Sequence, residues 1–176
     1  MWVVVLPLGF VSTNINADNA IDLSDERRNH LVTLSSISGE SVAIEHLTGK
    51  SVVVTFFASW CPPCRKEFQV LNALRDEFSP DDLTIVAVNV FEDFNDNDET
   101  RLKQFLNNTT PQFHVVSGTD DTKQQFGNIN RIPTLFVFDR QGQPAMHFIH
   151  HQGAKKSTAE LDELRDAIKA TLKTNS

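Results

Sequence analysis

The sequence of 176 residues has little cysteine, no tyrosine and a shortage of positive charge. Its two cysteines are too few for a disulfide scaffold or for a four-cysteine zinc site within one chain. Sixteen Lys and Arg against 23 Asp and Glu give a net charge of −7, so we expect no nucleic-acid partner. With 13 Phe and no Tyr, most aromatic rings are expected in the core, because Phe has no hydroxyl that needs a partner.

A ten-residue apolar segment, residues 2–11 (WVVVLPLGFV), lies near the start of the chain. It has the length of the apolar region of a signal peptide and is too short to span a bilayer. Ile15 and Ala17 fit the −3 and −1 positions of a cleavage site, although no Lys or Arg precedes Arg27. We therefore expect residues 1–20 to be a signal peptide or a disordered tail, and the protein to be exported, or cytoplasmic if the segment is not a signal.

Residues 21–176 are expected to form one domain, because no repeat and no Pro/Gly/Ser-rich linker divides them. The composition, with 40% hydrophobic and 22% charged residues, is typical of a globular protein. Segments 31–37 and 42–47 roughly alternate apolar and polar residues around a turn at 38–40. This period-2 pattern predicts an amino-terminal β-hairpin.

Strands and helices are predicted to alternate along the rest of the chain. Apolar runs rich in β-branched and aromatic residues predict buried strands at 51–57, 83–91 and 134–139, the last paired antiparallel with 144–150. A further strand is expected over 113–116, and helices after Cys64, over 99–106, over 120–126 and from Ser157, which forms a capping box with Glu160. This order implies a mixed sheet with helices on both faces.

The two cysteines lie in the sequence Cys61-Pro62-Pro63-Cys64, where the predicted strand 51–57 gives way to a helix. Free amide N–H groups and the positive end of the helix dipole favour a thiolate there, so Cys61 is the expected nucleophile. Cys64 lies one helical turn further on the same face, close enough to form a disulfide, and is the expected resolving thiol. The prolines lack an N–H group and stiffen the loop.

Three other interpretations of the cysteine pair stay open at this point: a structural disulfide, half of a zinc site completed by a dimer, and two inert thiols. Within the chain we expect no metal site. The acidic segment 92–99 places Asp93, Asn95 and Asn97 at the first three EF-hand ligand positions, but Asp98 stands where the loop needs glycine.

Two motifs resemble those of a known family. FFASWCPPCRKEF, residues 56–68, and RIPTLFVFDRQGQ, residues 131–143, are similar to the thioredoxin-like thiol-disulfide oxidoreductases of the TlpA/ResA/DsbE branch. The resemblance implies an α/β protein with the thioredoxin fold, in which helices flank a central mixed β-sheet. It also implies an amino-terminal β-hairpin and an inserted αβ segment between the second strand and residue 132.

The resemblance assigns substrate binding to residues on both sides of the cysteine pair. It implies that Pro133 is cis and faces the cysteines, and that the backbone of Ile132 pairs with a bound substrate strand. Trp60 is expected beside the exposed sulfur, with Pro62 and Pro63 completing the docking surface.

The resemblance also implies an acid three residues after the second cysteine, and Glu67 occupies that position. We expect Glu67 to be catalytic by moving a proton to or from the cysteine pair; the alternative is a solvated carboxylate on a helix. Ordinary thioredoxins have a buried Asp six residues before the first cysteine, where this chain has Thr55.

The resemblance implies a periplasmic thiol-disulfide oxidoreductase that exchanges or reduces disulfides of exported proteins. Apocytochrome c in cytochrome c maturation is the specific candidate substrate. A membrane thiol reductase of the DsbD type would supply electrons, and we expect a monomer with no cofactor besides the Cys61–Cys64 pair. Two alternatives stay open: a DsbA-like oxidant that forms disulfides, and a non-catalytic module that binds peptides.

Overall fold

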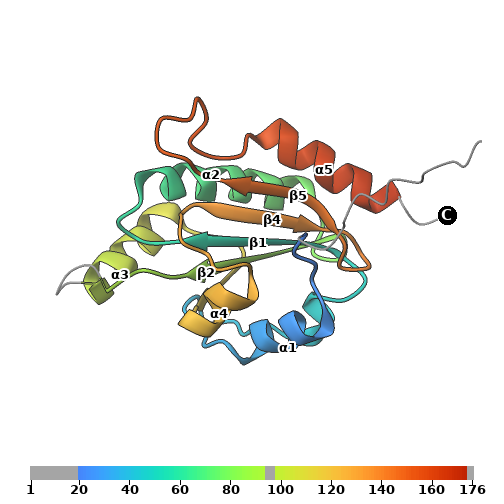
Figure 1. Cartoon of the computed structure of the whole chain (residues 1–176), viewed down its shortest axis with the longest axis horizontal. Coiled ribbons are helices and arrows are strands. Elements are labelled where there is room, and N and C mark those ends of the chain that lie inside the picture. Colours follow the sequence, from blue (N-terminus) through green and yellow to red (C-terminus); the bar gives the residue numbers. More distant parts are fainter. Residues whose placement is uncertain (1–19, 94–97, 174–176) are drawn as a thin grey trace, which may run out of the picture.

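A five-stranded mixed sheet with helices on both faces forms the protein (Figure 1). The computed structural model describes residues 20–93 and 98–173. The strands lie in the order β3-β2-β1-β4-β5, so β1 is central. In chain order the elements are α1 (Asp25–Thr33), the 3-10 helix η1 (Ile44–His46), β1 (Ser51–Phe57), α2 (Pro62–Glu77), β2 (Leu83–Asn89), α3 (Asp98–Thr109), β3 (His114–Ser117), α4 (Asp120–Gln125), β4 (Thr134–Phe138), β5 (Pro144–Ile149) and α5 (Leu161–Lys173).

The central strand β1 is buried along its whole length, as its β-branched and aromatic sequence predicts. It pairs in parallel with β2, from Ser51 opposite Leu83 to Phe57 opposite Asn89. On its other side it pairs antiparallel with β4, where Thr55 lies opposite Leu135. The carboxyl end of β1 is therefore held between two strands, and the chain leaves it directly toward the cysteine pair.

Alternate residues of β1 face two separate hydrophobic clusters. Val53 and Phe57 face the first cluster, which includes Cys64 and the buried residues of α2, α3 and α5. Val52, Val54 and Phe56 face the second cluster, on the other side of the sheet, to which α1 and the end of α4 contribute. Because successive side chains point to opposite faces of a sheet, Thr55 lies on the α2 side together with Val53 and Phe57.

The predicted amino-terminal hairpin over 31–37 and 42–47 is wrong. The first of these segments ends helix α1, and the second contains η1. Ser24 caps α1 by accepting a hydrogen bond from the amide of Arg27, and acidic residues fill the first turn. The three-residue spacing of Leu31 and Leu34 brings both into the second cluster, which an alternating strand would not do.

The last helix is one turn shorter than its predicted capping box implies. It begins at Leu161, so Ser157 lies outside the helix, and the side chain of Glu163 accepts a hydrogen bond from the amide of Glu160. The apolar residues of this helix face the core, because Leu164 and Ile168 are fully buried against α2 and the sheet.

The predicted strands and the inserted segment are confirmed within one or two residues. The insert is α3 followed by β3, which adds a parallel strand at the edge of the sheet beside β2. The segment around Ser36 lies along this edge, with the amide of Ile37 bonded to the carbonyl of Val115 at 2.8 Å. No helix among residues 20–93 and 98–173 is long and apolar enough to cross a membrane. The signal peptide predicted for residues 1–20 lies, except for its last residue, outside the described part.

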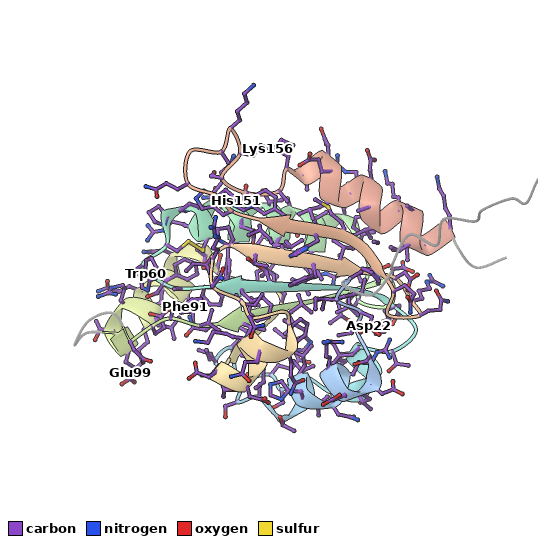
Figure 2. All side chains as sticks on the ribbon, in the orientation of Figure 1. Asp22, Trp60, Phe91, Glu99, His151 and Lys156 are labelled. Carbon is purple, nitrogen blue, oxygen red and sulfur yellow. A yellow bond between two sulfur atoms is a disulfide. The ribbon has the colours of Figure 1, made fainter. Side chains whose placement is uncertain are left out.

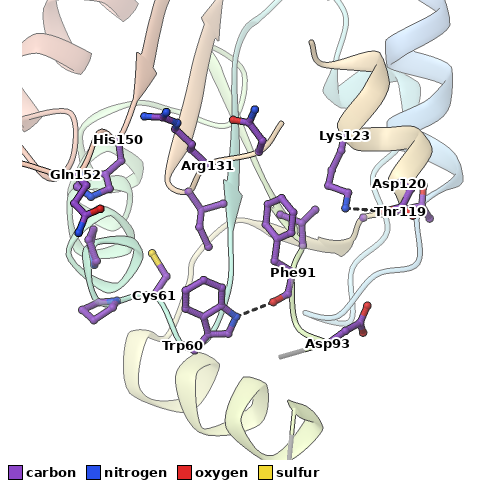
Figure 3. Close-up of a pocket in the computed structure, with 16 residues that line it drawn as sticks. Trp60, Cys61, Phe91, Asp93, Thr119, Asp120, Lys123, Arg131, His150 and Gln152 are labelled. Atoms are coloured by element: carbon purple, nitrogen blue, oxygen red, sulfur yellow. Dashed lines mark hydrogen bonds and ion pairs between the residues drawn. The ribbon is translucent and has the colours of Figure 1, made fainter. Parts of the chain in front are cut away.

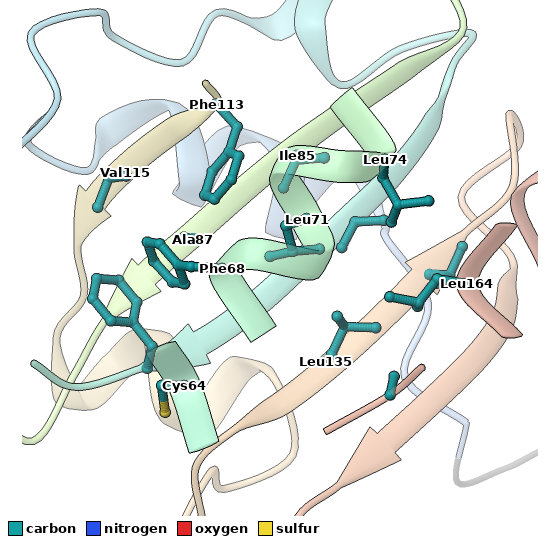
Figure 4. Packing of buried hydrophobic residues seen from close by; sticks show 14 of the residues in the cluster. Cys64, Phe68, Leu71, Leu74, Ile85, Ala87, Phe113, Val115, Leu135 and Leu164 are labelled. Atoms are coloured by element: carbon teal, nitrogen blue, oxygen red, sulfur yellow. The ribbon is translucent and has the colours of Figure 1, made fainter. Parts of the chain in front are cut away.

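Phe68 of α2 anchors the helix that carries the cysteines. Its fully buried ring packs against Phe57, Phe105 and Phe113, with ring centroids 4.7, 4.9 and 5.2 Å away. Figure 4 shows Phe68, Leu71 and Leu74 on the face of α2 that meets the sheet.

We predict that Phe68→Ala lowers the free energy of unfolding by about 3–5 kcal/mol, because it removes a large buried ring and leaves a cavity. Urea unfolding of the oxidised protein measures this change. Gln69→Ala, an exposed position on the same helix, is the matched control and should change stability by less than about 0.5 kcal/mol. A loss below about 1 kcal/mol for Phe68→Ala would contradict this account of the core.

Candidate active site

Cys61 and Cys64 form a disulfide at the start of α2, with their Cα atoms 5.3 Å apart. Cys61 is the N-cap of the helix, and its sulfur accepts a hydrogen bond from the amide of Cys64 at 3.3 Å. Pro62 and Pro63 occupy the first two helical positions, where an N–H group has no helical acceptor. The nucleophile predicted from the sequence therefore lies at a helix N-terminus, where a thiolate is favoured.

The two sulfurs differ in their surroundings. Cys64 is fully buried beside Phe68 in the first hydrophobic cluster, whereas Cys61 is 4% exposed and borders a surface groove. Figure 2 shows the disulfide at the same end of the molecule as Trp60 and Phe91. Only Cys61 is thus placed to meet a partner's sulfur, which agrees with the predicted roles of nucleophile and resolving thiol.

The groove beside Cys61 has a volume of about 1010 Å³ (Figure 3). Four of the predicted binding residues line it: Trp60, Pro62, Pro63 and Ile132. Trp60 is 38% exposed, and its indole N–H donates to the carbonyl oxygen of Phe91 at 2.7 Å. An exposed indole that is fixed beside a reactive sulfur forms a docking surface for an apolar segment of another polypeptide.

The opposite wall of the groove begins at the Ile132–Pro133 peptide bond, which is cis as the resemblance implies. Pro133 itself is buried, and its carbonyl accepts the amide of His150 at 2.9 Å. Arg131 and His150 also line the groove. The structure thus brings the two sequence motifs, about 70 residues apart, to the same cavity.

Sequence reasoning missed several groove residues that come from other segments, namely Phe91, Lys123, Arg131, His150 and Gln152. Lys123 of α4 lies over the ring of Phe91, with its Nζ atom 4.5 Å from the ring centroid, and pairs with Asp120 at 2.6 Å. Lys123 reaches the groove only through the packing of α4, and His150 and Gln152 reach it through the β5–α5 connection, so no local pattern marks these three. Phe91 follows β2, and Arg131 begins the second sequence motif.

Glu67 is fully buried on α2, so the alternative of a solvated helix carboxylate is wrong. Its Oε1 atom accepts a hydrogen bond from the hydroxyl of Thr55 on β1. Its Oε2 atom finds no hydrogen-bond partner among the described residues. Glu67 follows Cys64 by three positions on α2, a spacing that places the two side chains on the same helical face.

Burial raises the pKa of Glu67 from its ordinary value of 4.5 to about 7, and the hydrogen bond from Thr55 opposes this rise. Thr55 thus stands at the position where ordinary thioredoxins have a buried Asp, and its hydroxyl donates a hydrogen bond to a different buried acid, Glu67. Alternation along β1 predicts that Thr55 faces α2, so this contact was accessible from the sequence. A carboxyl group that titrates near neutral pH can both accept and return a proton.

Among the described residues, Glu40, His46 and His114 form a group whose ligand atoms lie within 4.8 Å of one another. The two imidazoles are stacked, with centroids 4.8 Å apart, and Nδ1 of His46 accepts the amide N–H of Ala43 at 3.1 Å. Because Nδ1 accepts this hydrogen bond, the imidazole proton of His46 lies on Nε2. The amide then occupies Nδ1 and the proton occupies Nε2, so neither nitrogen is free to bind a metal ion. This group therefore does not fit a metal ion.

Comparison with known proteins supports a thiol-disulfide exchange site at Cys61 and Cys64, as the geometry does. Residues 22–164 match the family model described as Redoxin. Thiol-disulfide oxidoreductase ResA of Bacillus subtilis is 26% identical over 143 residues, which cover 81% of this chain and 77% of the relative. Thioredoxin-like protein YneN of Bacillus subtilis is 28% identical over 110 residues, which cover 62% of each chain.

A crystal structure of a candidate thiol:disulfide interchange protein DsbE from Chlorobium tepidum has a TM-score of 0.63 and 26% identity, covering 79% of this chain and 91% of that one. The thioredoxin fold, the cysteine pair at a helix N-terminus and the cis proline across the groove agree with these similarities. The chain belongs to the Redoxin family and is a thioredoxin-fold thiol-disulfide oxidoreductase.

Proposed function

We propose that this oxidoreductase reduces disulfides of exported proteins through Cys61 and Cys64. The observation that carries the proposal is the asymmetry of the pair, with one sulfur at the mouth of a groove and the other enclosed in the core. A non-catalytic peptide-binding module needs no such asymmetry, since it would gain nothing from an accessible sulfur at a helix N-terminus.

The exchange runs in two steps that balance in atoms and electrons. The Cys61 thiolate attacks one sulfur of the substrate disulfide, forming a mixed disulfide and releasing the other substrate sulfur as a thiolate. Cys64, as a thiolate, then attacks Cys61, which closes the Cys61–Cys64 disulfide and releases the second substrate sulfur. Two electrons pass to the substrate, and its two thiolates take up protons.

Glu67 is proposed to accept the proton that Cys64 must lose before the second step. While the cysteines are oxidised, its Oε2 atom is buried with no hydrogen-bond partner among the described residues. Reduction creates an S–H donor on the same face of α2. A pKa of about 7 keeps the carboxyl close to the point at which it takes up and releases protons readily.

The groove is proposed to bind an extended substrate segment between Trp60 and Ile132. A chain lying there places its cysteine against Cys61, and the backbone of Ile132 provides hydrogen-bonding groups for it, as in β-strand addition. The apolar face of Trp60 covers the substrate side chains next to the cysteine.

Apocytochrome c is proposed as the substrate and a membrane thiol reductase of the DsbD type as the electron donor, both in the periplasm. The support is the branch resemblance of the two sequence motifs together with the apolar segment 2–11. Apocytochrome c presents a Cys-x-x-Cys-His segment, whose disulfide must be opened before haem is attached.

The direct test is to trap the mixed disulfide. Cys64→Ala, with the resolving thiol removed, should accumulate a covalent complex with an oxidised Cys-x-x-Cys-His peptide, detected by mass spectrometry, whereas Cys61→Ala should form none. Equal trapping of unrelated protein disulfides would support a general reductase and contradict the cytochrome assignment. Absence of any trapped complex would contradict substrate exchange through Cys61.

We predict a reduction potential for the pair near or below about −230 mV, in the range of reducing thioredoxin-like proteins. Fluorescence of Trp60 in defined redox buffers, in a chain carrying Trp2→Phe, measures it, since Trp60 then is the single indole. A value near about −120 mV would identify an oxidant of the DsbA kind and exclude the proposed direction.

We predict that the reduction rate of a protein disulfide contains a component that rises with pH around 7, where the Glu67 carboxylate forms. Thr55→Val removes the hydrogen bond that lowers the pKa of Glu67, so this component should move to higher pH. Glu67→Gln should abolish it and leave the titration of Cys61 alone. Glu26→Gln, at an exposed acid on α1, is the control, and unchanged profiles in both test variants would rule out proton transfer by Glu67.

The raised pKa of Glu67 also makes the free energy of unfolding fall as the pH rises. The Glu67 carboxyl ionises near 4.5 in the unfolded chain but near 7 in the folded protein, so the folded state binds more protons between these values. The free energy of unfolding therefore falls as pH rises through this window, by about 3 kcal/mol from this group. Urea unfolding at pH 4.5 and 8 should give a smaller loss for Glu67→Gln than for wild type; an equal loss would contradict the raised pKa.

A further inference from the structure

Glu92, which sequence reasoning did not single out, joins the end of β2 to the loop that precedes Cys61. Its Oε1 atom accepts the amide N–H of Ser59 at 2.6 Å, and its Oε2 atom accepts the hydroxyl of Ser59 at 2.7 Å. Oε1 also accepts the side-chain N–H of Asn89 at 2.7 Å. One carboxylate thus receives three hydrogen bonds from two segments.

A second set of contacts runs parallel to this one. The amide of Val90 donates to the carbonyl of Phe57 at 2.8 Å, and the indole of Trp60 donates to the carbonyl of Phe91 at 2.7 Å (Figure 3). The segments 57–60 and 89–92 are therefore tied together on both sides of Ser59. Among the described residues, Glu92 is the only charged side chain that takes part in these contacts between the two segments.

The backbone adopts an uncommon conformation beside these contacts. Phe91 has a φ angle of 59°, in the left-handed region that bulky residues seldom adopt. This conformation turns the chain after β2, and the neighbouring Lys123 packs over the Phe91 ring. Uncommon backbone angles at a binding groove are a sign that the local geometry is used.

We propose that Glu92 is a positioning residue for the redox site, which fixes the loop 58–60 so that Trp60 and Cys61 are prearranged for a protein substrate. The proposal rests on the groove being the substrate-docking site. Attack on a disulfide requires the incoming sulfur to approach along the S–S bond, so the position of Cys61 relative to the docked chain sets the rate. A small disulfide can turn to meet a displaced sulfur, whereas a chain held in the groove cannot.

The test compares two disulfide substrates with the prereduced protein: insulin, as a protein disulfide, and Ellman's reagent, as a small one. Glu92→Ala should lower the rate constant with insulin about tenfold and change that with Ellman's reagent less than about twofold. Glu92→Gln should restore insulin reduction to within about twofold of wild type, because an amide can still accept from the Ser59 amide and donate to its hydroxyl. Glu99→Ala, at an exposed acid on α3, is the matched control.

Ser59→Ala provides a second variant, since it removes one of the three hydrogen bonds and should give a smaller loss in the same direction. If Glu92→Ala does not fold, the same comparison of substrates is made with Ser59→Ala. Equal losses with both substrates, a Glu92→Gln variant as slow as Glu92→Ala, or unchanged insulin reduction would each overturn the positioning role. If the wild type reduces the oxidised Cys-x-x-Cys-His peptide but not insulin, the same comparison is made with that peptide. A wild-type protein that reacts with Ellman's reagent but with neither insulin nor the peptide would instead overturn protein docking itself.

Discussion

The hydrogen bond from the Cys64 amide to the Cys61 sulfur ties the chemistry of the site to the fold. It forms because α2 begins at Pro62, shortly after the end of β1, and β1 is held between β2 and β4. The rest of the helix is held in place by Phe68 and the buried leucines that follow it. Any change that shifts α2 relative to β1 therefore moves the sulfur away from the helix N-terminus that favours its ionised form.

Burial of Glu67 adds a cost that only its surroundings make acceptable. A carboxyl group in an apolar cluster is tolerated as the neutral acid, and the Thr55 hydroxyl supplies one hydrogen bond to it. The remaining oxygen has no partner among the described residues. A packed apolar side chain at this position would stabilise the fold more. An acid three residues after Cys64 is therefore understandable through proton transfer rather than through stability.

How much was predictable from sequence depends on the range of the interactions. The buried strands, α2 and the cysteine pair follow from local patterns, and the alternation of β1 already places Thr55 on the side of α2. The hairpin over 31–47 failed because alternation in two short segments is weaker evidence than the Ser24 cap and the Leu31–Leu34 spacing. Glu92 and Lys123 could not be assigned, since they reach the site only through tertiary packing.

The direction of electron flow depends on how strongly the Cys61 thiolate is stabilised. Potentials of about −230 and −120 mV differ by about 110 mV, which is about 5 kcal/mol for two electrons, whereas a hydrogen bond to a charged group contributes about 1.5–3 kcal/mol. Pro62 and Pro63 remove two amide donors from the first helical positions, so the structure offers the sulfur the Cys64 amide and the helix dipole. With so few donors the Cys61 thiolate stays reactive rather than strongly stabilised, which favours a reductant.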